Sequence, residues 1–364
     1  MDGTTEQPAG KESASPRQPR PDIATLTTVA LCLVVAAAAW FLLRELAALL
    51  RPLLLAVFLC YVIIPMHHRL TQRVPKAFSI VVMAGVSVGL LLLLSLMVYG
   101  SVVELNEELP RLIERGGEIV NQLRSLMSSR LPAWLVSEGG DAVTIQAQTG
   151  ARIREATGAL VNAAADVLRE AVLIAIYLIF LLLEVHRFPA RIQSGFAGER
   201  AERILAVVGN INDAIASYLK VKVKASLVLA IPALVILWAF GVKFALLWGV
   251  LTFLLNFIPY LGSVISCSLP ILLAFLQLPL GWEPVAVAVL LVGDHTLSAY
   301  LIEPAMTGKA VGLSPLVILA SLSFWGLCWG LIGMFLAVPL TVMLKIVLEN
   351  VTFTRPFAKL LGEG

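Results

Sequence analysis

The chain has 364 residues, of which 59% are hydrophobic and 14% charged, and its formal net charge is +3. Soluble domains are about 45–50% apolar and about 25% charged, so this composition excludes an ordinary soluble protein. The positive charge is small and scattered, and no nucleic-acid partner is expected. The apolar excess instead predicts a protein whose partner is the lipid bilayer.

The chain begins with a polar segment and then becomes strongly apolar. Residues 1–22 are rich in Pro and poor in aromatic residues, so we expect a disordered tail there. Apolar blocks follow at 24–43 and 46–66. Each block reaches the roughly 20 residues that a helix needs to cross a bilayer. Because only Arg44 and Glu45 lie between them, the two blocks are expected to form a tight hairpin.

A third apolar block, 77–99, leads into a polar stretch of mixed charge. Residues 100–158 contain six Arg, no Lys and eight acidic residues. Their first part, 100–130, spaces Leu and Ile at helical intervals among the charges. This spacing indicates an amphipathic helix on the membrane surface or against a neighbouring subunit. Because short cytoplasmic loops accumulate Lys and Arg, 100–158 is predicted to be extracytoplasmic.

The other polar segments set the orientation of the chain. Residues 67–76 are basic without any acid, and 184–224 hold seven basic residues against four acids. Both segments, and the basic tail 351–364, are predicted to be cytoplasmic, which places both termini inside the cell. The chain then divides into N-terminal transmembrane helices over 23–99 and a transport core over 159–350 that includes the cytoplasmic 184–224.

Five further apolar stretches are expected in that core. Helices are predicted at 171–183 with an upstream extension, at 225–240 and at 284–302. The stretches 244–278 and 313–349 are longer, and each contains helix breakers. The sequence therefore predicts an all-α, polytopic integral membrane protein with about eight hydrophobic helical units, two of them interrupted or re-entrant.

The two interruptions contain residues that bend or weaken helices. They are Asn256, Pro259 and Gly262 in the first stretch, and Gly330, Gly333 and Pro339 in the second. Pro removes a backbone donor, and hydrocarbon offers no water to the freed backbone groups. Such breaks are tolerated where they line a cavity or are buried in protein, and paired broken helices indicate substrate sites in secondary transporters. The pattern predicts a transporter.

Polar side chains inside the apolar stretches are candidates for the transport chemistry. The amide of Asn256 could orient a polar solute, or it could form a hydrogen bond between helices. We favour the pathway role because the residue adjoins the break. Asp294 and His295 lie inside an apolar segment that Glu303 and Pro304 end. They could relay protons or bind a cation. Alternatively, Asp294 could face a vestibule and pair with a basic group, and Glu303 could hold a helix junction.

Enzyme motifs are largely missing from the sequence. It contains no GxxxxGK[ST], HExxH or GxSxG pattern, so the chain is not expected to be its own ATP motor or one of these hydrolases. The LVGD sequence at 291–294 lacks the first Gly of the GxGD pattern of intramembrane aspartyl proteases. The four cysteines form no CxxC pair. We expect no catalytic residue, no metal site and no cofactor.

Two long segments resemble the signatures of a known family. The first comprises YLKVKVKASL at 218–227 and FGVKFALLWGVLTFLLNFIPYLGSVISCSLP at 240–270. The second is IEPAMTGKAVGLSPLVILASLSFWGLCWGLIGMFLAVPLTVMLK at 302–345. The resemblance is to the autoinducer-2 exporter (AI-2E) family of bacterial inner-membrane permeases. It covers the membrane portion of the chain and is strongest from 218 to 345.

This resemblance implies a secondary carrier or channel-like exporter that needs no cofactor and assembles as a homo-oligomer in the bacterial inner membrane. Some members are similar to exporters of autoinducer-2 (AI-2), a small polar quorum-sensing signal, and others to Na⁺(Li⁺)/H⁺ antiporters. The positions that match the family are Asn256, Pro259, Gly262, Glu303, Pro304, Gly308, Pro315, Gly330, Gly333 and Pro339.

The chain departs from the family pattern at two places. Tyr260 stands where relatives often have Asn after the Pro of the NFIP sequence. Ala299 and Tyr300 stand where relatives often have Gly-Asn before the Glu-Pro pair. Each departure puts a phenol in place of a smaller or amide group. The resemblance therefore implies a narrower and more aromatic pathway than in those relatives.

The sequence as a whole predicts export of a small polar solute without ATP. The expected pathway residues are Asn256, Pro259, Tyr260, Gly262, Gly330, Gly333 and Pro339, and the expected residues for H⁺ or Na⁺ coupling are Asp294, His295 and Glu303. One alternative is a Na⁺(Li⁺)/H⁺ antiporter in which the same carboxylates bind the cation. Another is a scaffold without transport that binds a partner through 100–158.

Overall fold

Helices account for the regular structure of the chain. The structure is a computed structural model that describes residues 23–72, 74–130, 142–185, 187–196, 198–302, 312–351 and 354–362. No strand occurs in these ranges, and the all-α polytopic fold predicted from the sequence is confirmed. The tail predicted at 1–22 and the coupling residue Glu303 lie outside the described residues.

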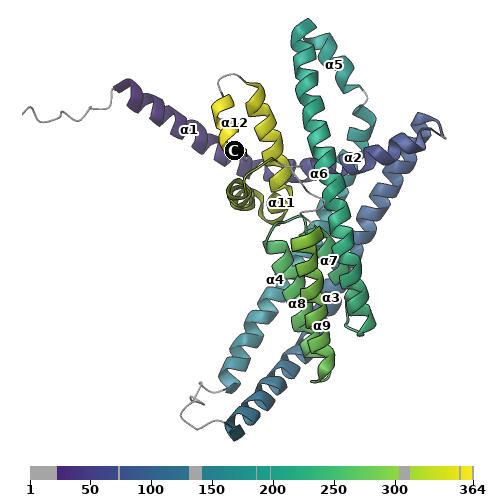
Figure 1. Cartoon of the computed structure of the whole chain (residues 1–364), viewed down its shortest axis with the longest axis vertical. Helices are drawn as coiled ribbons and strands as arrows, with labels where there is room; N and C mark the ends of the chain where they lie inside the picture. Colours follow the sequence, from purple (N-terminus) through teal and green to yellow (C-terminus); the bar gives the residue numbers. More distant parts are fainter. Residues whose placement is uncertain are drawn as a thin grey trace, which may run out of the picture. The chain divides into compact units, whose positions relative to one another are not determined.

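The helices are labelled along the chain in Figure 1. They are α1 (Ile23–Glu45), α2 (Ala47–Leu70), α3 (Lys76–Arg130), α4 (Ala142–Glu184), α5 (Phe188–Gly195), α6 (Gly198–Ala239), α7 (Ala245–Leu255), α8 (Leu261–Gln277), α9 (Trp282–Leu297), the π-helix η1 (Ser298–Ile302), α11 (Pro315–Asn350) and α12 (Arg355–Leu361). Within the described ranges, α2, α3, α6, α9 with η1, and α11 are long and apolar enough to cross a bilayer, whereas α7 and α8 are shorter apolar helices.

The chain divides into two compact units, 1–46 and 47–364. In the first unit, α1 carries exposed apolar side chains along most of its described length, which suits a helix that faces lipid. The guanidinium of Arg44 lies 6.0 Å from the ring centroid of Trp40, near the end of this helix. The tight hairpin expected after 24–43 stays a prediction. All further contacts below lie within the second unit.

The segments 77–99 and 100–130, which the sequence analysis separated, form one helix. α3 is 55 residues long, and Pro110 lies inside it rather than at an end. The change from apolar to charged residues near 100 thus reflects a change in the environment of the helix, whose backbone continues without interruption. At about 1.5 Å per residue, α3 is far longer than the roughly 30 Å of bilayer hydrocarbon, so it extends beyond it. It packs along α4 (Figure 1).

α6 begins well before the apolar segment 225–240 that predicted it. The first part of α6 belongs to the segment 184–224, which the sequence predicts to be cytoplasmic. Some of its side chains are nevertheless buried. Ile215 and Leu219 pack with Phe58 of α2 and Leu336 of α11 in one buried apolar cluster. The middle of α6 therefore belongs to the helical core, and the cytoplasmic location of 184–224 stays a prediction.

The two interrupted stretches fold as predicted. The first becomes α7 and α8, which pack on each other, and the second is α11 with a non-helical residue at Gly330. α7 has 11 residues and rises about 16 Å, so it is too short to cross the hydrocarbon alone. A short helical hairpin and a kinked helix therefore take the place of two simple spans.

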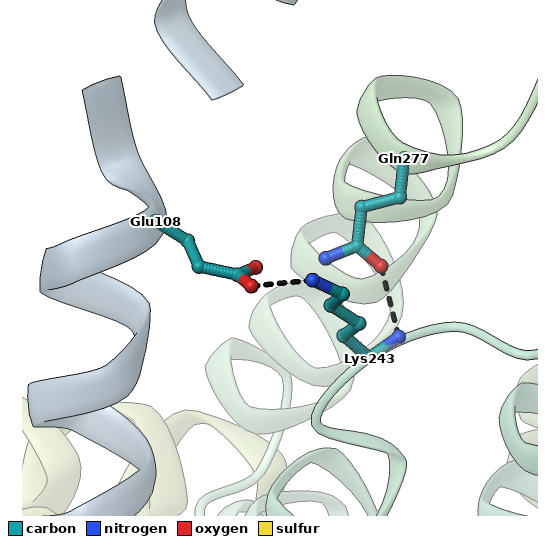
Figure 2. A network of polar contacts seen from close by, with 3 residues as sticks. All are labelled: Glu108, Lys243 and Gln277. Carbon is teal, nitrogen blue, oxygen red and sulfur yellow. Dashed lines mark hydrogen bonds and ion pairs between the residues drawn. The ribbon is translucent and has the colours of Figure 1, made fainter. Parts of the chain in front are cut away.

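A polar network joins α3 to the start of α7 and to the end of α8. Figure 2 shows Lys243, in the turn between α6 and α7, with Glu108 of α3 and Gln277 of α8. The ammonium group of Lys243 forms an ion pair with Glu108, and its backbone N–H donates to Oε1 of Gln277 at 2.8 Å. One residue thus fixes the start of α7, the end of α8 and the flank of α3 together.

Candidate functional site

The first break is a strained turn between α7 and α8. Tyr260 has φ 64° and ψ −59°, and the N–H of Leu261 donates to the carbonyl oxygen of Pro259 at 2.8 Å. These are the features of a γ-turn with positive φ, which is rare and strained. A bulky residue with positive φ is a genuine outlier that persists only where the surrounding structure imposes it, commonly at functional sites.

Gly262 makes the turn possible by letting two stretches of backbone approach each other. A β-carbon at this position would lie 1.8 Å from the carbonyl oxygen of Leu255 and 2.5 Å from its carbonyl carbon. Real β-carbons essentially never come within 3.0 Å of such atoms. The start of α8 can therefore sit against the end of α7 only because position 262 has no side chain.

The backbone groups of the first break remain hydrogen-bonded although the helix is interrupted. The N–H groups of Asn256, Phe257 and Ile258 donate to carbonyls three or four residues earlier, at 3.1, 3.2 and 2.8 Å. The N–H of Gly262 donates to the carbonyl oxygen of Ile258 at 3.0 Å. Because hydrocarbon supplies no replacement for a lost backbone bond, this local satisfaction lets the break exist inside a membrane protein.

The side chain of Asn256 ties the break to α6. Its Nδ2 donates to Oγ of Ser226 at 3.0 Å, and both residues are buried. The interhelical hydrogen bond considered for Asn256 from the sequence therefore exists. Ser226 was missed, because one serine in an apolar helix has no sequence signal that names its partner. The only available signal was its position inside the apolar half of α6.

The second break, in α11, has a similar backbone geometry. Gly330 has φ 65° and ψ −141°, a conformation outside the helix. A β-carbon on Gly333 would lie 1.9 Å from the carbonyl oxygen of Trp325, so the chain folds closely back here as well. Pro339 is buried further along the same helix. Both breaks thus combine a residue with positive φ and a glycine at a position where a β-carbon would overlap a backbone carbonyl.

The two breaks, far apart in sequence, pack against each other. The ring centroids of Phe257 and Phe335 are 4.8 Å apart, and Phe58 of α2 completes the group at 5.8 and 5.1 Å from them. Ile258 and Ala337 share a second buried cluster. Residues next to the first break therefore contact the segment that follows the second one, which brings the two predicted halves of the pathway together.

The predicted pathway residues are not equally placed around this contact. Asn256, Gly262, Gly333 and Pro339 are buried, Pro259 is half-buried, and Tyr260 and Gly330 are exposed. The exposed residues are the two with positive φ. The strained backbone at each break therefore lies at the surface of the described chain, while the neighbouring residues hold the two breaks together.

His295 is fixed between α9 and α8. Its Nδ1 lies 3.0 Å from the carbonyl oxygen of Leu291, and its Nε2 lies 3.0 Å from Oγ of Ser266. A carbonyl oxygen only accepts, so Nδ1 carries a hydrogen, and in the neutral ring the Ser266 hydroxyl donates to Nε2. Ser266 is in the first turns of α8, so His295 is linked directly to the element that begins at the first break.

Asp294 also lies between helices but lacks such partners. Its Oδ2 is buried and has no hydrogen-bond partner among the described residues. The pairing with a basic residue that the sequence left open is absent from the described part of the chain. Among the predicted coupling residues, His295 thus contacts α8 through Ser266, while Glu303 lies outside the described residues.

The chain matches known proteins across this whole region. The family described as "AI-2E family transporter" matches residues 29–353. AI-2 transport protein TqsA of Escherichia coli (strain K12) is 28% identical over 321 residues, 88% of this chain and 91% of that protein. A Haemophilus influenzae protein named "Putative transport protein" is 31% identical over 325 residues, which are 87% of this chain and 91% of that protein. A Borreliella burgdorferi protein of the same description is 32% identical over 196 residues, 52% of this chain and 53% of its own length.

The two glycines at the breaks give a direct test of this geometry. We expect Gly262→Ala and Gly333→Ala to lower the melting temperature of the purified protein strongly or to abolish folding, because each methyl group would overlap a backbone carbonyl. Gly85→Ala and Gly293→Ala are matched controls, since a β-carbon there meets nothing within 4 Å. Equal stability of all four variants in a thermal unfolding assay would contradict the proposed close approach.

Proposed function

Because the chain belongs to the AI-2E transporter family, we propose that it is a secondary carrier that exports a small polar solute across the bacterial inner membrane. The observation that carries the proposal is the packing of the two broken helices on each other through Phe257 and Phe335. Discontinuous helices at membrane depth form the solute sites of many secondary transporters. We propose that both termini lie in the cytoplasm, because the basic segments of the sequence favour that side of the membrane.

The arrangement of the breaks suggests how the gate works. Aromatic and aliphatic side chains such as those of Ile258 and Ala337 can slide or separate without breaking hydrogen bonds, whereas the backbone of the first break keeps its local bonds. Moving one break against the other would then open a path while leaving few polar groups unsatisfied. Since unpaired backbone groups in hydrocarbon cost several kcal/mol each, this division of roles keeps the barrier to movement low.

AI-2 is the first solute to consider. TqsA is by its name an AI-2 transport protein, and the present chain matches 91% of its length. Tyr260, exposed at the strained turn, is the residue that we expect to alter solute choice relative to relatives with Asn. A phenol offers one hydroxyl and a flat apolar face in place of an amide, which favours solutes with an apolar ring face.

Coupling to an ion is assigned to Asp294, His295 and Glu303. His295 is hydrogen-bonded to Ser266 of α8, the helix that starts at the first break, and Asp294 precedes His295 in α9. Protonation or cation binding here would change contacts with the element that has to move. A Na⁺(Li⁺)/H⁺ antiporter is the second candidate. It is favoured by Oδ2 of Asp294, which is buried and has no hydrogen-bond partner among the described residues. We further propose that the protein works as a homo-oligomer.

The test is release of preloaded AI-2 from proteoliposomes that contain the purified protein, with and without a pH gradient. Asn256→Ala is compared with Ser226→Ala, since both remove the same interhelical hydrogen bond. Such bonds average about 0.6 kcal/mol in membrane proteins, so both variants should lose similar stability. If Asn256 also contacts the solute, Asn256→Ala should slow release by about tenfold more than Ser226→Ala, a difference of about 1.4 kcal/mol.

Equal release by the two variants would reduce Asn256 to a structural residue. Absence of any protein-dependent release would remove AI-2 as the solute and direct the assay to Na⁺- or Li⁺-driven proton movement. Release that needs the protein but ignores the gradient would indicate a passive facilitator.

Asp294→Asn tests the coupling residue separately. The amide cannot exchange a proton or neutralise a cation, so we expect release by this variant to lose its dependence on the pH gradient while the protein remains folded and inserted. The measurement is the initial rate of release at several external pH values, beside the wild type. A variant with the wild-type pH profile would show that Asp294 has no part in coupling.

A further inference from the structure

A strained residue lies on either side of α7, the first helix of the hairpin. Phe244, directly before α7, has φ 61° and ψ 25°, and Tyr260, in the first break, has φ 64° and ψ −59°. Within the residues that the structure describes, these are the only non-glycine residues with positive φ. Bulky side chains keep such a backbone only where the surrounding structure imposes it. The backbone at Phe244 must therefore be held by its neighbours, as it is at the break.

α3 and α8 supply these neighbours through Lys243. The ammonium group of this residue, which directly precedes Phe244, forms an ion pair with Glu108 of α3 (Figure 2). Its backbone N–H donates to Oε1 of Gln277, the last residue of α8, at 2.8 Å. One residue thus connects the strained start of α7 to two other helices.

Two further residues of α3 contact the same end of the hairpin. Leu112 packs against the buried cluster that includes Leu273 of α8. At Gly116, a β-carbon would lie 3.5 Å from Cδ2 of Leu276, so the backbone of α3 passes close to the last turn of α8. These two residues and Glu108 are spaced by four, which places them on one face of a helix. α3 therefore presents one continuous face to the open end of the hairpin.

We propose that this contact is a releasable clamp, whose opening lets α7 turn at Phe244 and separates the first break from the second. The clamp consists of Glu108, Leu112, Gly116, Lys243, Leu276 and Gln277. Lys243 is its positioning residue, because it binds both α3 and α8 and adjoins the strained backbone. The role of the clamp in transport rests on the proposed function, but its opening can be measured without transport.

The strength of the clamp suits a contact that opens and closes. The side chain of Lys243 is 56% exposed and that of Glu108 is 20% exposed, so water weakens the ion pair. Exposed ion pairs shift an equilibrium by about fivefold at most. Gly116 brings no side chain to the contact, although the space at 3.5 Å would accept a methyl group. The clamp is therefore weaker than its own geometry allows.

The hairpin connects the clamp to the first break. α7 has 11 residues and α8 has 17, and the two helices pack on each other. At about 1.5 Å per residue, the clamp and the break are separated by about 16 to 25 Å along these helices. Ile258, at the break, is buried against Ala337 of α11. A turn of the hairpin at its clamped end thus displaces Ile258 relative to Ala337.

Labelling of a buried thiol measures this movement directly. Ile258→Cys is introduced into the full-length protein after replacement of the four native cysteines, and a maleimide is added to the protein in lipid vesicles. When opening and closing are fast, the labelling rate follows the population of the open form. We expect Glu108→Gln to raise this rate by about twofold to fivefold. Added salt should also raise it, and less so in Glu108→Gln, because salt screens the ion pair.

Charge variants separate the clamp from a general effect of charge on α3. Glu118→Gln is the matched control, since Glu118 pairs with Arg115 inside α3 and not with the hairpin. Glu108→Lys or Lys243→Glu alone should speed labelling, because each places like charges together. The two reversals combined should bring the rate back to near that of the Ile258→Cys parent, which a residue needed only for folding would not do.

A variant that strengthens the clamp gives the opposite sign. Gly116→Ala adds a methyl group in ordinary van der Waals contact with Leu276 and should slow the labelling of Ile258→Cys. Gly100→Ala is the control in the same helix, because a β-carbon there meets nothing within 4 Å. Both substitutions favour the helix equally, so only a contact with the hairpin distinguishes them.

The outcomes distinguish the clamp from the proposed function. Faster labelling in Glu108→Gln, recovery in the double reversal and no change in Glu118→Gln would support the clamp, even if the vesicles release no solute. Equal labelling rates in all variants would overturn it, and intact solute release in the same vesicles would then preserve the proposed function. If a charge-reversal variant does not fold, Gly116→Ala against Gly100→Ala decides the question.

Discussion

At Gly262 and at Gly333, a backbone carbonyl oxygen occupies the space that a β-carbon of any other residue would need. The constraint behind both is the lack of water in hydrocarbon, which obliges every interrupted helix to satisfy its backbone groups locally. At the first break this is done by tightened turns and by the γ-turn at Tyr260. At the second, Gly330 changes the direction of the chain within one residue. The close approach of backbone to backbone makes both breaks compact enough to be packed.

Once the breaks are compact, the surrounding helices can hold them. Phe58 of α2 lies against Phe257 and Phe335, and Ser226 of α6 binds Asn256. On the other side, His295 links α9 to α8. A change at the end of α9 therefore reaches the first break through a single helix. This connection joins the proposed coupling residues to the proposed gate without requiring movement of the whole core.

Much of this arrangement was predictable from the sequence, because the relevant signals are local. Pro259 and the glycines interrupt apolar runs that would otherwise be long spans, and both breaks occur where predicted. The sequence did not show that α3 continues through the charged residues at 100–130. The polarity of a segment indicates whether it faces lipid or water, but it does not indicate where a helix ends. Ser226 gave no signal, because only the folded chain shows that this serine is the partner of Asn256.

We expect the two breaks to move against each other during transport, and a cross-link between them tests this movement. Ile258→Cys and Ala337→Cys, which lie in one buried cluster, are introduced after replacement of the four native cysteines. A short thiol-specific linker then joins the two positions in proteoliposomes. Solute release should stop when the link forms and return when a reducible link is cleaved. Release at the same rate with the breaks joined would show that this movement is not needed for transport.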